Sequence, residues 1–269
     1  MSGAVDAHAI CRSERLGDDV SLGPFAVVEP GAVLGDGAAV GSHAVIGAGA
    51  VVGTRASIGA GAIVAAGIEV GQDAVVRDGA VVLRPVPRAT VVEGNPARIC
   101  GYAGRGTSVP MDPVRQEVEL AGEQASIVDT AVRGVKIHRL PAVRDLRGSL
   151  VAGELEGRLP FIARRFFIVH DVPGAEVRGE HAHYVCHQFL VCVSGQVHVI
   201  ADDGETRQEF VLSDNRTGIY LPPMVWGTQY RYSPDCSLLV LASHPYDNDD
   251  YIRDYDAYLA ELAVRRADG

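Results

Sequence analysis

Eleven consecutive hexads decide the fold of the first part of the chain. They run from Val20 to Pro85: VSLGPF, AVVEPG, AVLGDG, AAVGSH, AVIGAG, AVVGTR, ASIGAG, AIVAAG, IEVGQD, AVVRDG and AVVLRP. The third residue of each hexad is aliphatic, the fourth is usually Gly and the first is usually Ala. A period of six is neither that of a flat strand nor that of a helix. It predicts a short strand and a corner, repeated, with the aliphatic residue inside a prism. Three hexads per triangular coil give a left-handed parallel β-helix of about three to four coils.

The remainder of the chain predicts a linker and a second domain. We place the β-helix at residues 1–103, the linker at 104–131 and the second domain at 132–269. The linker is polar, with Gly, Pro and Glu, and we expect at most one short helix there. The second domain contains short Val-, Ile- and Phe-rich runs bounded by turn residues, which predict a sandwich or barrel. A short amphipathic helix is expected at the C-terminus, so the fold class is all-β with one terminal helix.

Composition excludes several classes of function. The formal net charge is −10, with no long Lys/Arg run, which disfavours nucleic-acid and membrane-surface binding. The five cysteines contain no C-x-x-C spacing, as expected for reduced thiols in a cytoplasmic protein. The N-terminus has no apolar signal core, and charged residues and glycines interrupt the apolar stretch of the hexads.

The densest polar cluster is RGEHAHYVCHQ, residues 178–188. His181 and His183 are two residues apart, so on a strand both side chains point to one face. Imidazole is the side chain best suited to proton transfer near neutral pH. We therefore predict that this pair is catalytic.

The same segment resembles the first cupin motif, H-x-H-x(4)-E-x(6)-G, and GIYLPPMVW at 218–226 resembles the second. Cupins use the paired His, the Glu and a final His as metal ligands inside a jelly-roll barrel. In this chain Gln188 replaces the carboxylate and Gly227 stands near the place of the last His. Two good ligands are too few, so we predict no catalytic metal.

The second domain also resembles the WxcM-like sugar-nucleotide 3,4-ketoisomerases. The matching stretches are DLRGSL (145–150), LPF (159–161), RRFFIVHDVPGAEVRGEHAH (164–183), HQFLVCVSGQV (187–197), GIYLPPMVW (218–226), LLVLAS (238–243) and YDNDDYIRDYDAYL (246–259). The resemblance implies a dTDP-linked 4-keto-6-deoxyhexose as substrate, converted to its 3-keto isomer through an enediol or enediolate without a cofactor. One departure is that Ile168 and His170 stand where the family often has aromatic residues.

Roles for individual residues follow from this resemblance. His181 or His183 is the base, and the other relays a proton or polarises the oxygen. Arg178 and Arg165 are candidates for the diphosphate, because a guanidinium binds phosphate in a bidentate manner. The side chains expected to line the sugar or base pocket are Gln188, Tyr220 and Trp226.

The hexad domain resembles the acyltransferases that use acetyl-CoA or acyl carrier protein, and VPRATVVEGNPARICGY (86–102) resembles the end of sugar acetyltransferases. Acetyl-CoA is therefore a candidate ligand, with His43 as a candidate base. The hexads, however, lack the longer loop that such enzymes usually insert. The structural alternative is a trimerising scaffold, which would give a hexamer if the cupin domains also pair.

Three alternative functions stay open. The first is a nucleotide-sugar 3,5-epimerase, and the second is a metal-dependent cupin dioxygenase, which Gln188 and Gly227 disfavour. The third is a non-catalytic sugar-binding module on a β-helix. The sequence does not decide between a gluco and a galacto product.

Overall fold

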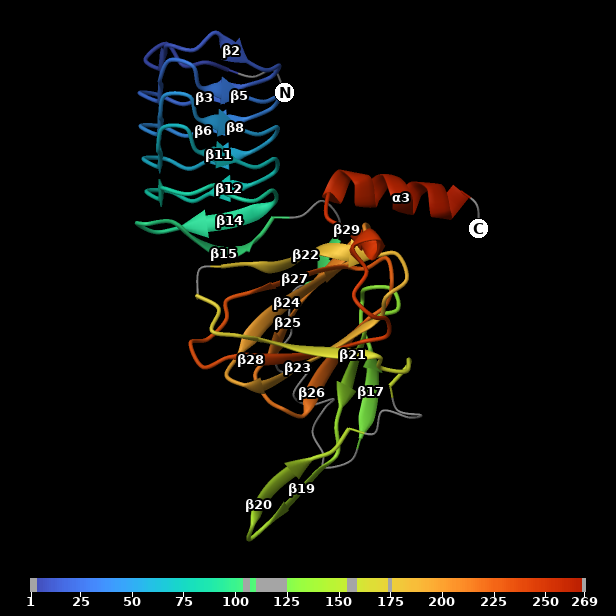
Figure 1. The fold of residues 1–269 in the computed structure, drawn as a ribbon. Helices are drawn as coiled ribbons and strands as arrows, with labels where there is room; N and C mark the ends of the chain where they lie inside the picture. The colour runs from blue at the N-terminus through green and yellow to red at the C-terminus, as the bar shows by residue number, and fades with distance from the viewer. Residues whose placement is uncertain (1–3, 104–106, 110–124, 154–158, 174–175, 268–269) are drawn as a thin grey trace. The chain divides into compact units, whose positions relative to one another are not determined.

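The computed structural model describes residues 4–103, 107–109, 125–153, 159–173 and 176–267 (Figure 1). The chain forms two compact units, residues 1–104 and 105–269. The fold is nearly all-β: a parallel β-solenoid, then a cupin-like unit with a C-terminal helix, as the sequence predicts.

The first unit consists of three parallel sheets, ordered β1-β4-β7-β10-β13, β11-β8-β5-β2 and β15-β14-β12-β9-β6-β3, the last with one antiparallel edge strand. Partners are 18 residues apart in the hexads, as in Val27↔Val45 and Val45↔Ile63. The solenoid strands are β1 (Ile10–Cys11), β2 (Arg15–Leu16), β3 (Ser21–Leu22), β4 (Val27–Val28), β5 (Val33–Leu34), β6 (Ala39–Val40), β7 (Val45–Ile46), β8 (Val51–Val52), β9 (Ser57–Ile58), β10 (Ile63–Val64), β11 (Glu69–Val70), β12 (Val75–Val76), β13 (Val81–Val82), β14 (Thr90–Glu93) and β15 (Arg98–Tyr102).

The solenoid is longer than the hexads alone predict. β1 and β2 precede Val20, and β14 adds a parallel strand after the last hexad. These outer segments depart from the hexad consensus, because a terminal coil has a neighbour on one side only. β15 then pairs antiparallel with β14 at the end of the solenoid.

The hexad positions pack as expected. The third-position side chains, such as Ile46, and the first-position alanines, such as Ala44, form one continuous buried core. Gly47 shows why the fourth position is small, since a Cβ atom there would lie 2.5 Å from the backbone nitrogen of Ala66 in the next coil. Stacked coils thus exclude larger residues at this corner.

We predict that Ile46→Ala lowers the free energy of unfolding of the solenoid by about 2–4 kcal/mol, because it removes a fully buried side chain and leaves a cavity. Val51→Ala is the control, since Val51 is the outward second residue of a hexad on another sheet and is exposed. Urea denaturation followed by circular dichroism measures both. Equal losses in the two variants would contradict the inward orientation of the third position.

The second unit contains two facing six-stranded sheets, ordered β16-β25-β24-β27-β22-β29 and β17-β18-β26-β23-β28-β21. Apolar side chains such as Leu190, Val199, Phe210 and Leu238 form its core. The strands are β16 (Thr107–Val109), β17 (Ser126–Asp129), β18 (Lys136–Arg139), β21 (Arg165–His170), β22 (Arg178–His183), β23 (Gln188–Ser194), β24 (Val197–Asp202), β25 (Thr206–Leu212), β26 (Thr217–Leu221), β27 (Trp226–Tyr230), β28 (Ser237–Ala242) and β29 (Tyr251–Ile252). β19 (Ala142–Asp145) and β20 (Gly148–Val151) form a separate hairpin.

Two strands lie within the stretch predicted to be a linker. β16 pairs in parallel with β25, and β17 pairs antiparallel with β18. Both sit at sheet edges, where unpaired backbone groups accept an added strand despite a polar sequence. The short helix expected between Gly101 and Ser126 falls mainly on residues 110–124, outside the described residues.

The predicted C-terminal helix is α3 (Tyr255–Ala267). Its Tyr258 and Leu262 pack with Ala182, Met224 and Trp226, on a cluster separate from the core between the sheets. Just before it lies the 3₁₀ helix η1 (Asn248–Asp250), followed by β29. Among the described helices, none combines the length and apolar character needed to cross a membrane.

Candidate functional site

Strand β22 brings the two predicted catalytic histidines together. The ring centroids of His181 and His183 are 4.9 Å apart, with the planes at 88°. A bulge precedes them: Gly179 (φ 80°) and Glu180 (φ 52°) have left-handed backbone conformations, and the pairing with β27 shifts between Gly179 and His181. The bulge inserts Glu180 as an extra residue, so that His181 lies opposite Gly227.

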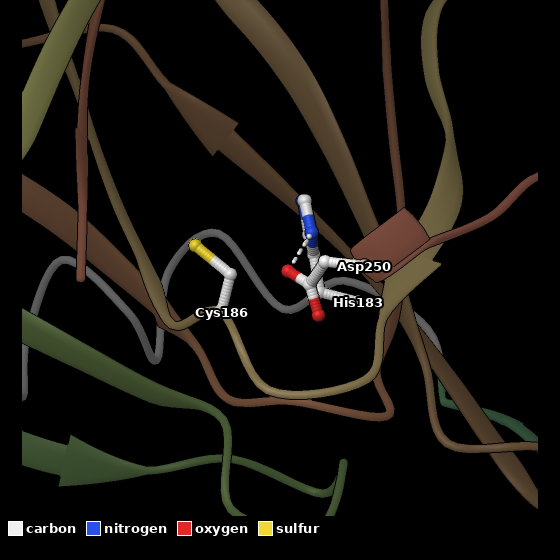
Figure 2. Close-up of side chains that lie close together, drawn as sticks. All are labelled: His183, Cys186 and Asp250. Atoms are coloured by element: carbon white, nitrogen blue, oxygen red, sulfur yellow. Dashed lines mark hydrogen bonds and ion pairs between the residues drawn. The ribbon is translucent and has the colours of Figure 1, made fainter. Parts of the chain in front are cut away.

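His183 is held by a buried carboxylate. Its Nδ1 lies 2.9 Å from Oδ2 of Asp250, and both residues are buried. Oδ1 of Asp250 accepts the backbone N–H of Val185 at 2.8 Å. β29 pairs with the end of β22, and this pairing places Asp250 beside His183. Figure 2 shows the carboxylate and the imidazole facing each other, with the Cys186 thiol nearby.

The side chain of Gln188 contacts the second ring nitrogen of His183. The side-chain nitrogen of Gln188 lies 3.0 Å from Nε2 of His183. With this amide orientation Nε2 accepts, so the ring proton sits on Nδ1 and is donated to Asp250. The predicted site residue Gln188 is therefore beside the His pair, and both ring nitrogens of His183 are engaged.

His181 has a different environment. Its Nδ1 lies 2.8 Å from the carbonyl oxygen of Gly179, which fixes the ring proton there. No described residue hydrogen-bonds its Nε2. His181 lines a cavity of about 10 Å3, which is about the size of one water molecule. The other lining residues are His183, Cys186, Gln188, Leu221, Pro222, Val225, Gly227 and Gln229. Nε2 of His181 is thus the available proton acceptor of the pair.

Burial keeps both rings neutral at physiological pH. Desolvation lowers the pKa of His181 to about 4, against 6.5 for an exposed histidine, with smaller contributions from His183 and Arg253. Desolvation also lowers the pKa of His183, although Asp250 opposes the shift. A neutral imidazole is the form that removes a proton from carbon.

We predict that kcat/KM stays high well below pH 6.5 and falls only near pH 4, because the base loses its function when His181, with its pKa of about 4, is protonated. The same shift lowers stability as the pH falls from 6.5 towards 4, since the unfolded chain binds this proton first. The acidic fall in kcat/KM is measured with a pH–rate profile. The profile is limited to the pH range in which circular dichroism shows a folded protein. An acidic limb near 6.5 would contradict the neutral, desolvated His181.

Aromatic and cationic side chains form a wall beside the histidines. The Tyr251 ring lies 4.9 and 4.3 Å from the centroids of His181 and His183, and the Arg253 guanidinium lies 4.2 Å from the Tyr251 ring. Tyr246 contacts Tyr251 at 5.7 Å, and Arg165 lies 5.5 Å from the Tyr246 ring. Nε of Arg165 is buried without a hydrogen-bond partner among the described residues. The predicted Arg165 therefore belongs to the surroundings of the site.

Two predicted pocket residues lie elsewhere. Tyr220 is adjacent to Leu221, which lines the cavity, and points to the opposite face of its sheet. There it packs with Phe189 and Val191 and its hydroxyl lies 2.7 Å from Nδ1 of His187. Trp226 likewise points away from the side of Gly227 and packs against Tyr255 and Tyr258 of α3. Neither side chain therefore lines the cavity of the histidines, because successive strand residues face opposite sides of a sheet. Their assignment to the sugar or base pocket stays a prediction.

The other two predicted residues are exposed. Arg178 begins β22, opposite Gln229, and is on the strand of the His pair. His43 belongs to the first unit, where its ring stacks on Phe25 with centroids 5.1 Å apart. It is a corner residue with φ of 59°.

Sequence reasoning missed four residues at the site: Asp250, Tyr251, Arg253 and Gln229. The first three belong to the YDNDDYIRDYDAYL stretch quoted for the family resemblance, but Asp250 is 67 residues from His183 in the chain. The alternation along β27 could have pointed to Gln229, which follows Gly227 by two residues.

The two facing β-sheets and the cavity lined by two imidazoles define the second unit as a cupin. Comparisons with known proteins identify the family within this class. The family described as WxcM-like, C-terminal, matches residues 133–263, and the bacterial transferase hexapeptide family matches residues 15–48. A relative from Aneurinibacillus thermoaerophilus, TDP-4-oxo-6-deoxy-alpha-D-glucose-3,4-oxoisomerase, is 42% identical over 134 residues, which cover 49% of this chain and 96% of the relative. The chain belongs to the WxcM-like family.

Solved structures of similar proteins include a 3,4-ketoisomerase from Helicobacter canadensis, with 32% identity, a TM-score of 0.47, and coverage of 48% of this chain and 98% of that one. The WlaRB TDP-quinovose 3,4-ketoisomerase from Campylobacter jejuni is 36% identical, with a TM-score of 0.47 and coverage of 48% and 99%.

Proposed function

We propose that the second unit is a 3,4-ketoisomerase that converts a TDP-linked 4-keto-6-deoxyhexose to its 3-keto isomer. The 42% identical relative is named for this activity. The observation that carries the chemistry is the pair of desolvated, neutral imidazoles lining one cavity, with Nε2 of His181 available as an acceptor.

The reaction moves protons and no external electrons. His181 removes the proton from C3, the C3–H electron pair forms a C3=C4 double bond, and the C4 carbonyl becomes an enediolate oxygen. Loss of the proton from the C3 hydroxyl and delivery of a proton to C4 then give a ketone at C3. Protonated His181 is a stronger acid than an exposed imidazolium because its pKa is lowered to about 4, which favours returning the proton. The ring centroid of His183 lies 4.9 Å from that of His181, and Asp250 holds the ring proton of His183 on Nδ1. When the Gln188 amide N–H turns from Nε2 to the substrate, Nε2 of His183 accepts the proton of the C3 hydroxyl and relays it.

Binding of the nucleotide is assigned to the wall of aromatic and cationic groups. Arg165 carries a guanidinium with an unsatisfied buried N–H, and Arg253 lies over the Tyr251 ring next to the histidines. A diphosphate supplies an oxygen acceptor for Nε–H of Arg165 and further acceptors for Arg253, which already donates from Nη1 to the carbonyl oxygen of Asn248 at 3.4 Å. Arg178, exposed on the same strand as the histidines, is a further candidate for this contact.

We also propose that catalysis needs no metal. The cupin ligand positions carry the Gln188 amide and Gly227 in place of a carboxylate and an imidazole, and both nitrogens of His183 have partners. Enolisation by a neutral base requires no redox cofactor. Turnover unchanged after exhaustive EDTA treatment is the expected result, whereas activity that returns only with added metal would contradict this proposal.

Product NMR in deuterated water tests the function against its alternatives. A ketoisomerase gives a ketone at C3 and solvent deuterium at C4. A 3,5-epimerase leaves the ketone at C4 and exchanges C3 and C5, and a sugar-binding module binds without exchange. The configuration at C4 of the product distinguishes the gluco from the galacto series.

For the first unit we propose self-assembly into a trimer. The outward residues of sheet β1-β4-β7-β10-β13 form an apolar ladder: Ile10, Val27, Val45, Ile63 and Val81. The corresponding ladders on the other two sheets contain Arg15 and Glu69, or Ser21 and Ser57. An apolar stripe on one face of three favours burial against other copies. Ile63→Arg should lower the mass measured by light scattering, whereas Glu69→Arg should leave it unchanged, and an intact trimer in Ile63→Arg would overturn this interface.

Acetyl transfer by the first unit stays a prediction, with His43 as its candidate base and acetyl-CoA as its ligand. Calorimetric titration of the full chain with acetyl-CoA decides it. A transferase should bind acetyl-CoA saturably at micromolar concentration, and His43→Ala should weaken this binding. If the titration gives no heat of binding, the unit is a scaffold.

A further inference from the structure

Cys186 is a buried thiol at the catalytic cavity that the proposed reaction does not use. It lines the cavity with His181 and His183, and its nearest polar contacts are weak, with the carbonyl of His187 at 3.5 Å and the hydroxyl of Ser243 at 3.9 Å. The ligand atoms of Cys186, His183 and Asp250 all lie within 4.8 Å of one another, and all three residues are buried (Figure 2). Sulfur, imidazole nitrogen and carboxylate oxygen are the three ligand types of zinc sites.

We propose that His183, Cys186 and Asp250 form an inhibitory site for a thiophilic divalent cation such as zinc. The cation would remove His183 and Asp250 from catalysis, so the inhibition, but not the binding, rests on the proposed function. The site shares His183 with the cupin metal position but uses Cys186 and Asp250 in place of His181 and residue 188.

The geometry needs only small adjustments. Tetrahedral zinc separates a nitrogen and an oxygen ligand by about 3.4 Å, and a sulfur from either by about 3.6 Å. Nδ1 of His183 and Oδ2 of Asp250 are already 2.9 Å apart, so they must separate slightly. The sulfur of Cys186 lies within 4.8 Å of the ligand atoms of His183 and Asp250. Rotation of the cysteine side chain can shorten these separations to the values that zinc requires. Three protein ligands leave a fourth position for water, as in zinc sites that stay open.

Proton and charge balance also fit. Binding releases the thiol proton of Cys186, and the proton on Nδ1 of His183 is replaced by the metal while Nε2 gains one. Gln188 can accept a hydrogen bond from this Nε2–H if its amide turns to present the oxygen. One thiolate and one carboxylate neutralise a divalent cation, which offsets the unfavourable field of Arg165 and Arg253 acting on His183.

The test uses the full-length protein after EDTA treatment, in a Cys192→Ala background. This change removes a second thiol pair, Cys192 and Cys236 with sulfurs 3.7 Å apart, that could itself bind cadmium. We expect one equivalent of zinc to inhibit isomerisation, EDTA to restore it, and magnesium to have no effect. Cadmium should give an ultraviolet thiolate charge-transfer band in the same protein.

Adding Cys186→Ser should abolish the cadmium band and raise the zinc concentration for half-inhibition, relative to the metal-free turnover of the same variant, about tenfold or more. Cys186→Ala repeats the comparison if the serine variant is poorly folded by circular dichroism. A band or a zinc sensitivity that survives loss of Cys186, or a parent protein that gives neither, overturns the site. The cadmium band is read without substrate, so it decides the site even if the protein has no isomerase activity.

Discussion

His181→Gln reduces kcat by about 10²–10⁴-fold, the usual contribution of a general base, while the barrel stays folded. The physical reason is that Nε2 of His181 is the acceptor on the catalytic strand that no described residue engages, whereas both nitrogens of His183 have partners. Glutamine keeps a polar group of similar length but cannot take a proton from carbon at neutral pH. Stopped assays with product NMR measure the turnover.

The control for this variant is His170→Gln, because His170 is exposed and pairs only locally with Asp171. It should retain full activity. If His181→Gln still exchanges the C3 proton of the substrate at the parent rate, another group is the base, and the assignment of the available nitrogen is wrong.

Asp250→Asn lowers kcat by about 10- to 100-fold with KM nearly unchanged. The carboxylate fixes the proton of His183 on Nδ1 and also accepts the N–H of Val185, so it determines both the tautomer and the orientation of the ring. An amide can donate to Nδ1 and thereby stabilise the opposite tautomer, in which Nε2 carries the proton and opposes the Gln188 amide nitrogen.

Asp249→Asn is the matched control, one residue away in the same 3₁₀ helix and exposed. A positioning role requires a changed pH–rate profile and a shifted His183 imidazole NMR signal in Asp250→Asn, neither of which occurs in Asp249→Asn. If Asp250→Asn loses thermal stability but the folded fraction keeps an unchanged kcat, Asp250 has a structural role only.

The solenoid was predictable because each hexad repeats one local rule. The third residue points inward, the corner is small, and an 18-residue coil follows from the period, so Leu22 to Val82 need no long-range information. The pair His181 and His183 was predictable for a similar reason, since alternation along one strand is a local property. The bulge at Gly179 and Glu180 that positions them was not, because nothing in the sequence requires a left-handed glutamate there.

Two features of the site could not be read from the sequence: contacts that depend on long-range strand pairing, and the orientation of side chains on strands with two buried faces. Asp250 reaches His183 only because β29 pairs with β22, across 67 residues. Tyr220 and Trp226 lie on strands covered on both sides, where burial does not tell which face meets the cavity. Their neighbours Leu221 and Gly227 line it instead.

We propose that the paired imidazoles move a ketone from C4 to C3 of a nucleotide-linked 6-deoxyhexose. The decisive experiment incubates the EDTA-treated protein with TDP-4-keto-6-deoxyglucose in deuterated water and records the NMR spectrum of the product. We expect a 3-keto sugar carrying deuterium at C4, formed by the parent protein and about 10²–10⁴-fold more slowly by His181→Gln. A product whose ketone remains at C4, with exchange at C3 and C5, would contradict it.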